Sequence, residues 1–164
     1  LSGVNIMELK DSKKDKLSYN QVLFGAVQNM KSSGQIPDGM TMKQAVAAVI
    51  GEIGSKNVQT VQIGNTIFVG VFTPKKNNMY VRVYNMDVGR NLINSMYGYA
   101  AFLQKKGIAF ISAYIEDERL LPGLRVLQKR LEEKGTGFDV VELEKDDGYG
   151  MFIKLGKQSL MEAA

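Results

Sequence analysis

The stretch Val58-Gln-Thr-Val-Gln-Ile-Gly-Asn-Thr-Ile-Phe-Val-Gly-Val-Phe72 decides the fold of this chain. It contains two runs rich in β-forming residues, which are joined by Gly64-Asn65. A two-residue link that begins with glycine is typical of a β-hairpin. A third β-rich run, Met79 to Tyr84, follows after a polar turn. The sequence therefore predicts an antiparallel meander of three strands.

Apolar residues outside the meander change their spacing in a regular order. Spacings of three and four, which are typical of amphipathic helices, predict helices at residues 18–30, 41–53, 87–106 and 117–134. Further strands are predicted at residues 108–115, 138–143 and 149–155. The first of these strands is almost continuously apolar, as expected for a central strand that is covered on both faces. The predicted fold class is α+β: the meander is followed by a helix, a strand, a helix and a closing β-hairpin, with helices on both faces of a mixed sheet.

The length of 164 residues fits one domain with one core. We expect this domain to span residues 18–156. Residues 1–17 end in a run of lysines and aspartates, which predicts a mobile basic arm. Residues 157–164 form a C-terminal tail.

The composition excludes several classes of protein, because the chain contains neither histidine nor cysteine. Disulfide frameworks, thiolate or histidine-ligated zinc sites and a Ser-His-Asp triad are therefore ruled out, and we expect no metal site. The net charge of +4 is a mild excess, so a nucleic-acid partner is not expected. No run approaches the roughly 20 apolar residues of a membrane helix, and no secretory signal is seen, so we expect no membrane contact and a cytoplasmic location.

The order of predicted elements resembles the GCN5-related N-acetyltransferase (GNAT) fold over residues 18–155. Two local segments add to the resemblance: the turn Asn85-Met-Asp-Val-Gly-Arg90, and the helix that runs from Leu124 through a glycine step to Phe138. The resemblance implies an acyl-CoA-dependent N-acyltransferase with acetyl-CoA as its cofactor. It also implies a gap between the strand that ends at Tyr84 and the strand at 108–115, because that gap admits the pantetheine arm in GNAT enzymes.

The turn before the long helix carries an Arg/Gln-x-x-Gly-x-Gly/Ala pattern in that family. The resemblance implies that it holds the cofactor's pyrophosphate here through Asn85, Val88, Gly89 and Arg90. Amide groups at a helix N-terminus bind phosphates, and glycine allows close approach. This chain has only one glycine in the turn. The alternative is that Gly89 relaxes a tight turn and that Arg90 is solvated.

The family's usual catalytic residues are missing at their positions. The third strand of the meander has no carboxylate, and the last helix has no tyrosine before its basic residues. A carboxylate base could instead come from Glu116 or Asp117, at the carboxyl end of strand 108–115, where open α/β sheets bind ligands. Tyr114 or Tyr84 could act as the acid. The alternative is that the acidic group at 116–118 favours the positive end of the following helix.

A second interpretation of the missing motifs is a non-catalytic GNAT-like structural or assembly protein, similar to internal virion or accessory proteins of short-tailed phages. Such a protein would act through protein partners or homo-oligomerisation and could be virion-associated. A third interpretation is a small nucleic-acid-binding module that uses Lys75, Lys76, Arg82 and the basic arm at residues 1–17. Its binding would depend strongly on salt.

Overall fold

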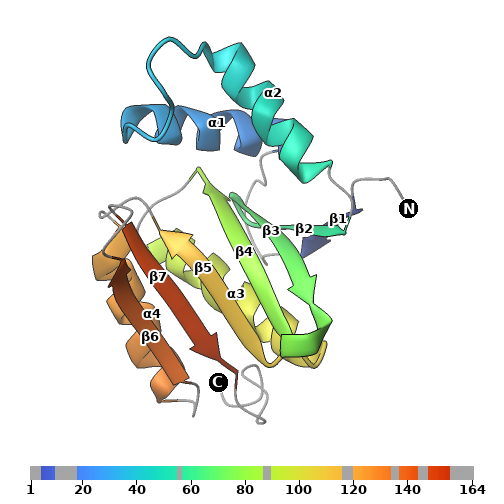
Figure 1. The fold of residues 1–164 in the computed structure, drawn as a ribbon, viewed down its shortest axis with the longest axis vertical. Coiled ribbons are helices and arrows are strands. Elements are labelled where there is room, and N and C mark those ends of the chain that lie inside the picture. Colours follow the sequence, from blue (N-terminus) through green and yellow to red (C-terminus); the bar gives the residue numbers. More distant parts are fainter. Residues whose placement is uncertain are drawn as a thin grey trace.

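The computed structural model describes residues 5–9, 18–54, 57–86, 90–115, 120–133, 137–143 and 148–155. These residues form an α+β structure with four α-helices and one mixed seven-stranded sheet (Figure 1). The helices are α1 (Tyr19–Ser32), α2 (Met42–Ile53), α3 (Arg90–Lys105) and α4 (Leu121–Glu132). The strands are β1 (Asn5–Leu9), β2 (Val58–Ile63), β3 (Thr66–Thr73), β4 (Asn78–Asn85), β5 (Phe110–Ile115), β6 (Gly137–Leu143) and β7 (Gly148–Lys154), and a short 3₁₀ helix, η1 (Pro74–Lys76), connects β3 to β4.

The predicted helices and strands are all present, with ends that differ by a few residues. Local chemistry explains the starts of the first two helices. The side chains of Ser18 and Thr41 accept hydrogen bonds from the backbone N–H groups of Gln21 and Gln44, whose side chains bond back to the cap residues. Each capping box satisfies two backbone N–H groups that the helix itself cannot pair.

The strand order in the sheet is β1-β2-β3-β4-β5-β7-β6. The β2, β3 and β4 strands are antiparallel neighbours, which confirms the predicted meander. The β4 and β5 strands are parallel, and β7 lies between β5 and β6 and is antiparallel to both.

The edge strand β1 is an addition that the sequence analysis did not anticipate. It pairs in parallel with β2, from Asn5 opposite Gln59 to Leu9 opposite Ile63. The predicted mobile arm over residues 1–17 therefore contains a paired strand. The strand is hard to recognise from its own sequence, because it is only five residues long and Ile6 is its one strong β former. The other residues of that segment, and the predicted tail at 157–164, lie outside the described residues.

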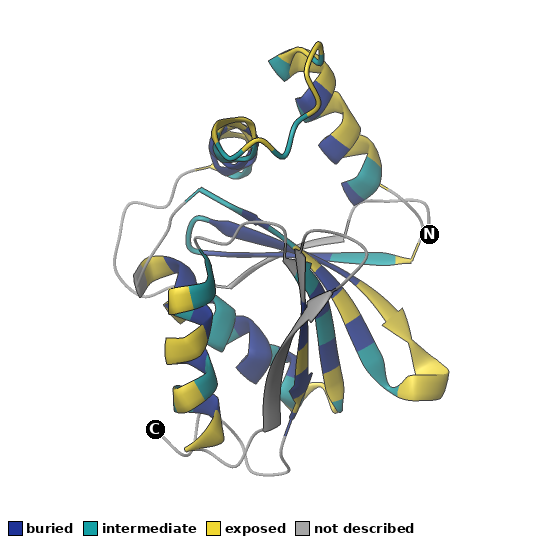
Figure 2. Cartoon of the chain, turned by 60° about the vertical axis from the view of Figure 1, so that its left-hand side comes forward, coloured by how far each residue is buried: buried dark blue, intermediate teal, exposed yellow. Residues whose placement is uncertain are grey.

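Helices cover both faces of the sheet, as the sequence predicts. On one face lies the α1–α2 core, whose buried members are Val22, Leu23, Ala26, Val27, Ala45, Val49, Ile53, Ile67, Val69 and Tyr84. On the other face lies the larger α3–α4 core, which includes Phe68, Met79, Val81, Tyr99, Leu103, Ile111, Leu124, Leu127, Leu131 and Ile153. Figure 2 shows buried residues along the central strands and at intervals along the helices. Alternate residues of β4 thus enter different cores, since successive side chains of a strand point to opposite faces.

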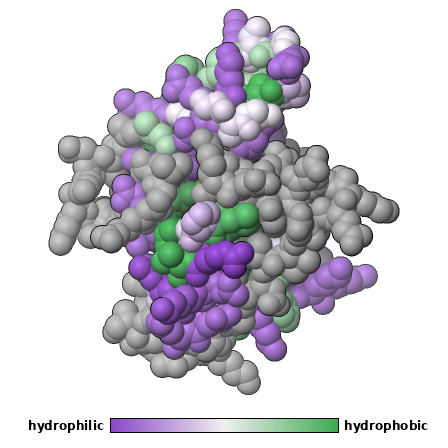
Figure 3. All heavy atoms as spheres, turned by 90° about the vertical axis from the view of Figure 1, so that its left-hand side faces the viewer, coloured by the Kyte–Doolittle hydropathy of each residue, from purple (hydrophilic) through white to green (hydrophobic). Residues whose placement is uncertain are grey.

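The α4 helix illustrates how a helix divides between core and solvent. Leu124, Leu127 and Leu131 are buried, whereas Arg125 and Lys129 are exposed. On the side of the molecule that carries α4, hydrophilic side chains cover the lower part and hydrophobic side chains gather near the middle (Figure 3). The burial of one face of α4 and the exposure of the other follow from its apolar residues, which recur at spacings of three and four.

Candidate functional site

The parallel ladder between β4 and β5 ends before the two strands do. It joins Asn78 through Val81 to Phe110 through Ala113. Beyond that point β4 stays paired with β3 as far as Asn85, and β5 stays paired with β7 as far as Ile115. The two strands therefore part at their carboxyl ends (Figure 1). The carboxyl ends of strands are where open α/β sheets usually bind ligands.

A cavity of about 390 Å³ lies at this point. Its walls come from α1 and the loop after it, from α2, and from the carboxyl ends of β4 and β5. The lining residues are Met30, Gln35, Glu52, Tyr80, Arg82, Val83, Tyr84 and Tyr114. Two of the three predicted catalytic residues, Tyr84 and Tyr114, thus share one cavity although they are far apart in the sequence.

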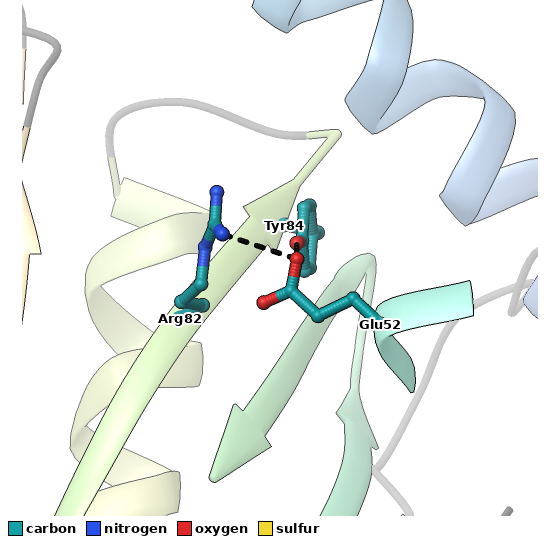
Figure 4. Close-up of polar contacts among 3 residues, drawn as sticks. All are labelled: Glu52, Arg82 and Tyr84. Carbon is teal, nitrogen blue, oxygen red and sulfur yellow. Dashed lines mark hydrogen bonds and ion pairs between the residues drawn. The ribbon is translucent and has the colours of Figure 1, made fainter. Parts of the chain in front are cut away.

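A polar cluster of three residues connects α2 to β4 within this cavity. The Tyr84 hydroxyl donates a hydrogen bond to Oε2 of Glu52 at 2.7 Å. Nη1 of Arg82 donates to the same oxygen at 3.1 Å and forms an ion pair with it. Figure 4 shows both side chains of β4 directed toward the carboxylate of α2. Arg82 and Tyr84 can meet one partner because they are two residues apart on a strand and share a face.

The environment of Tyr84 keeps its hydroxyl protonated at neutral pH. Burial, and then the hydrogen bond to Glu52, raise the pKa of Tyr84 well above its ordinary value of 10. The Arg82 guanidinium opposes this shift and lies 5.7 Å from the centre of the Tyr84 ring. Tyr84 therefore acts as a hydrogen-bond donor that orients the Glu52 carboxylate.

The predicted cofactor-binding residues lie at the end of β4 and beyond it. The backbone carbonyl of Asn85 accepts a hydrogen bond from Nδ2 of Asn29 on α1 at 2.9 Å. Arg90 is the first residue of α3. Val88 and Gly89 lie outside the described residues, as do Glu116 and Asp117, the two candidate bases. Their assigned roles stay predictions.

Glu52 is the site residue that the sequence analysis missed. It occupies the last turn of α2, beside the buried Ile53. Its local sequence gives no signal, because a glutamate among apolar helical residues reads as part of the solvated face. Only the tertiary packing of α2 against α1 and β2 brings its carboxylate to Tyr84. An alternating tyrosine–arginine strand of the kind seen in β4 could have prompted a search for such an acidic partner.

The described part of the chain contains no cluster of three or more acidic residues arranged to hold a metal ion. Within the same residues, no helix has both the length and the apolar character needed to cross a bilayer.

No protein-family model matches this chain, and no curated protein matches it significantly. The geometry of the cavity is therefore the basis for the function proposed below.

Proposed function

We propose that the chain is a divergent GNAT-like N-acyltransferase that transfers an acyl group from acyl-CoA to an amine. The observation that carries this proposal is the early end of the β4–β5 ladder, with a cavity of about 390 Å³ beside it. The resemblance stated above implies a gap between these two strands that admits the pantetheine arm. The element order of the chain, and helices on both faces of the sheet, are in keeping with the same family.

The residues around the gap fit an acyl-CoA cofactor. The cavity lies within the usual range for small-molecule sites, roughly 300–1,000 Å³. The carboxyl end of β4 extends past its last pair with β5, and a strand edge can pair with an extended, amide-bearing chain. Asn85, with which the predicted pyrophosphate turn begins, is the last residue of β4 and so lies at the same end of the sheet. When bound, the cofactor would supply an acyl group activated as a thioester.

Glu52 replaces Glu116 as the proposed base, because its carboxylate lines the cavity. Its Oε2 accepts from Arg82 and Tyr84, whereas its Oε1 accepts no hydrogen bond from the described residues. We propose that Oε1 binds the acceptor amine and takes the proton that the nitrogen loses as the new amide bond forms. Tyr114 lines the same cavity and is the proposed donor of a proton to the leaving sulfur. The amine reacts in its neutral form, after its ammonium ion has lost one proton to water. The proton that Glu52 then takes and the proton that Tyr114 gives balance, and exchange with water returns both side chains to their starting states.

Calorimetric titration with acetyl-CoA tests the cofactor site. We expect binding to the wild-type protein and loss of binding in Gln35→Trp, because Gln35 lines the cavity from the loop after α1 and the large indole ring would fill it. Gln28→Trp makes the same change at an exposed position of α1 and should leave binding intact. In an assay with an amine acceptor, Glu52→Gln should lower kcat by about 10²–10⁴-fold.

Absence of both heat and a thermal shift, at two temperatures, would contradict the enzyme and favour the second candidate. That candidate is a non-catalytic assembly protein, and an exposed strip of the sheet favours it. The strip is one row of paired residues that crosses four strands. Val71 pairs with Tyr80, Tyr80 with Ser112, and Ser112 with Phe152. Phe110 lies two residues from Ser112 on the same face of the sheet. The four large hydrophobic side chains of this strip are 40–50% exposed, which is typical of a surface that contacts another protein.

A further inference from the structure

We propose that the acceptor is a free amino acid, or a compound that likewise carries an amine next to a carboxylate. This inference rests on the proposed function and names the substrate class of the same cavity. Two oppositely charged side chains carry it. Among the described residues that line the cavity, Glu52 and Arg82 are the charged ones, and they lie side by side.

Glu52 has an oxygen available for a ligand. Both of the hydrogen bonds that it accepts from described residues end on Oε2, and Oε1 receives none from them. The side chain is 33% exposed, so a ligand in the cavity can reach it. A carboxylate oxygen that accepts no hydrogen bond from the described residues can accept one from an N–H group of an ammonium ion.

Arg82 also has unused hydrogen-bonding capacity. A guanidinium group carries five N–H donors in a fixed plane, and the Arg82 group uses Nη1 on Glu52. Its other donors make no hydrogen bond within the described part of the chain. The side chain is 52% exposed. Planar N–H donors of this kind bind carboxylates in pairs, which gives the ligand a defined orientation.

The charge of the pair decides between classes of amine. A simple cationic amine at Glu52 would lie next to the Arg82 guanidinium, and like charges at this distance repel. An amino acid avoids the repulsion because its carboxylate would bind Arg82 while its ammonium group binds Glu52. The α-amino group of a peptide or protein has an amide in place of that carboxylate, so this class of acceptor fits less well. The rings of Tyr80, Tyr84 and Tyr114 would surround the remaining atoms of the ligand.

The test measures binding without any acyl donor. Free amino acids are titrated into the wild-type protein, and each is compared with its α-amide, which lacks the carboxylate, and with its desamino analogue. We expect at least one amino acid to bind, and both of its analogues to bind about tenfold more weakly. Equal binding of the amino acid and its amide would overturn the inference, as would no binding of any amino acid at millimolar concentration.

Variants assign the two contacts. In Arg82→Gln, the preference for the amino acid over its amide should disappear, whereas in Glu52→Gln both ligands should bind more weakly. Arg125→Gln and Glu133→Gln make the same charge changes at exposed positions of α4 and its C-terminus, and should keep the wild-type preference. A preference that survives in Arg82→Gln would overturn the role of Arg82. If a variant does not fold, the comparison of ligands on the wild-type protein still decides the question.

The acetyl-CoA titration separates this inference from the function on which it rests. Binding of acetyl-CoA without any preference for amino acids would leave the acyltransferase in place and overturn the substrate class. Binding of neither ligand would overturn both.

Discussion

Two buried tyrosines show how a hydroxyl group can have opposite effects in one molecule. The Tyr84 hydroxyl donates to Glu52 at the cavity. The Tyr99 hydroxyl is buried in the α3–α4 core and has no hydrogen-bond partner among the described residues. The Tyr99 ring stacks on Phe68 with 4.3 Å between ring centres, so the apolar part of the side chain packs in the core. Burial raises the pKa of Tyr99, which therefore keeps its proton at neutral pH.

We expect the two Tyr→Phe substitutions to change stability in different directions. Tyr84→Phe removes a hydrogen bond to a carboxylate and should lower the free energy of unfolding by about 1.5–3 kcal/mol. Tyr99→Phe removes a buried, unpaired hydroxyl and keeps the stacked ring, so stability should be unchanged or higher by about 1 kcal/mol. Urea denaturation at pH 7 measures both. A larger loss in Tyr99→Phe than in Tyr84→Phe would contradict the assignment of partners.

At the scale of elements, one side chain of α1 holds the end of β4. Nδ2 of Asn29 donates to the backbone carbonyls of Asn85 at 2.9 Å and Met86 at 2.8 Å. Gly25, one helical turn earlier, lets the helix lie close, because a Cβ there would be 2.7 Å from Cγ of Met86. The helix thus fixes the point at which the chain leaves the sheet and enters the predicted cofactor turn.

Asn29→Asp should weaken this junction. The substitution keeps the shape of the side chain but replaces its two N–H donors with a carboxylate oxygen that faces two carbonyls. We expect the free energy of unfolding to fall by about 1–3 kcal/mol. Asn20→Asp makes the same change at an exposed position in the first turn of α1, where a negative charge is favourable, and should cause no loss. Equal losses in the two variants would show that the two carbonyls are not the cause.

At the scale of the whole molecule, the two cores share one sheet and we expect them to unfold together. Ile53 belongs to the α1–α2 core and Ile111 to the α3–α4 core. Ile53→Val and Ile111→Val should each lower the free energy of unfolding by about 0.5–1.5 kcal/mol. Their effects should add in the double variant, because the residues lie on opposite faces of the sheet.

Circular dichroism and tyrosine fluorescence, followed through the same urea titration, provide the measurement. Coincident transitions with an unchanged slope are expected for a single cooperative unit. Separate transitions, or a variant that shifts only one signal, would show that the α1–α2 core unfolds by itself.

Local patterns in the sequence were sufficient to predict the helices and most of the strands. The Gly64-Asn65 link and the alternation in Met79–Tyr84 predicted the meander, and Thr41 with Gln44 predicted the start of α2. The meander and the helix start were predicted correctly because caps, turns and periodicity depend on residues that are close together in the chain. Tyr84 and Tyr114 were named on the resemblance, which makes their strands neighbours; the structure brings both to one cavity, and their catalytic roles stay predictions.

Tertiary packing decided the rest. Three features of the sheet depend on segments that are distant in the sequence. They are the pairing of β1 with β2, the place of β7 between β5 and β6, and the end of the β4–β5 ladder at Val81 and Ala113. Glu52 became a site residue only because α2 packs against α1 and β2, which brings its carboxylate within 2.7 Å of the Tyr84 hydroxyl. The sequence alone thus determined the kinds of elements and their order. The structure determined which side chains meet. The cavity is built by contacts between segments that are distant in the sequence, and the local pattern of one segment does not indicate which other segment it will contact.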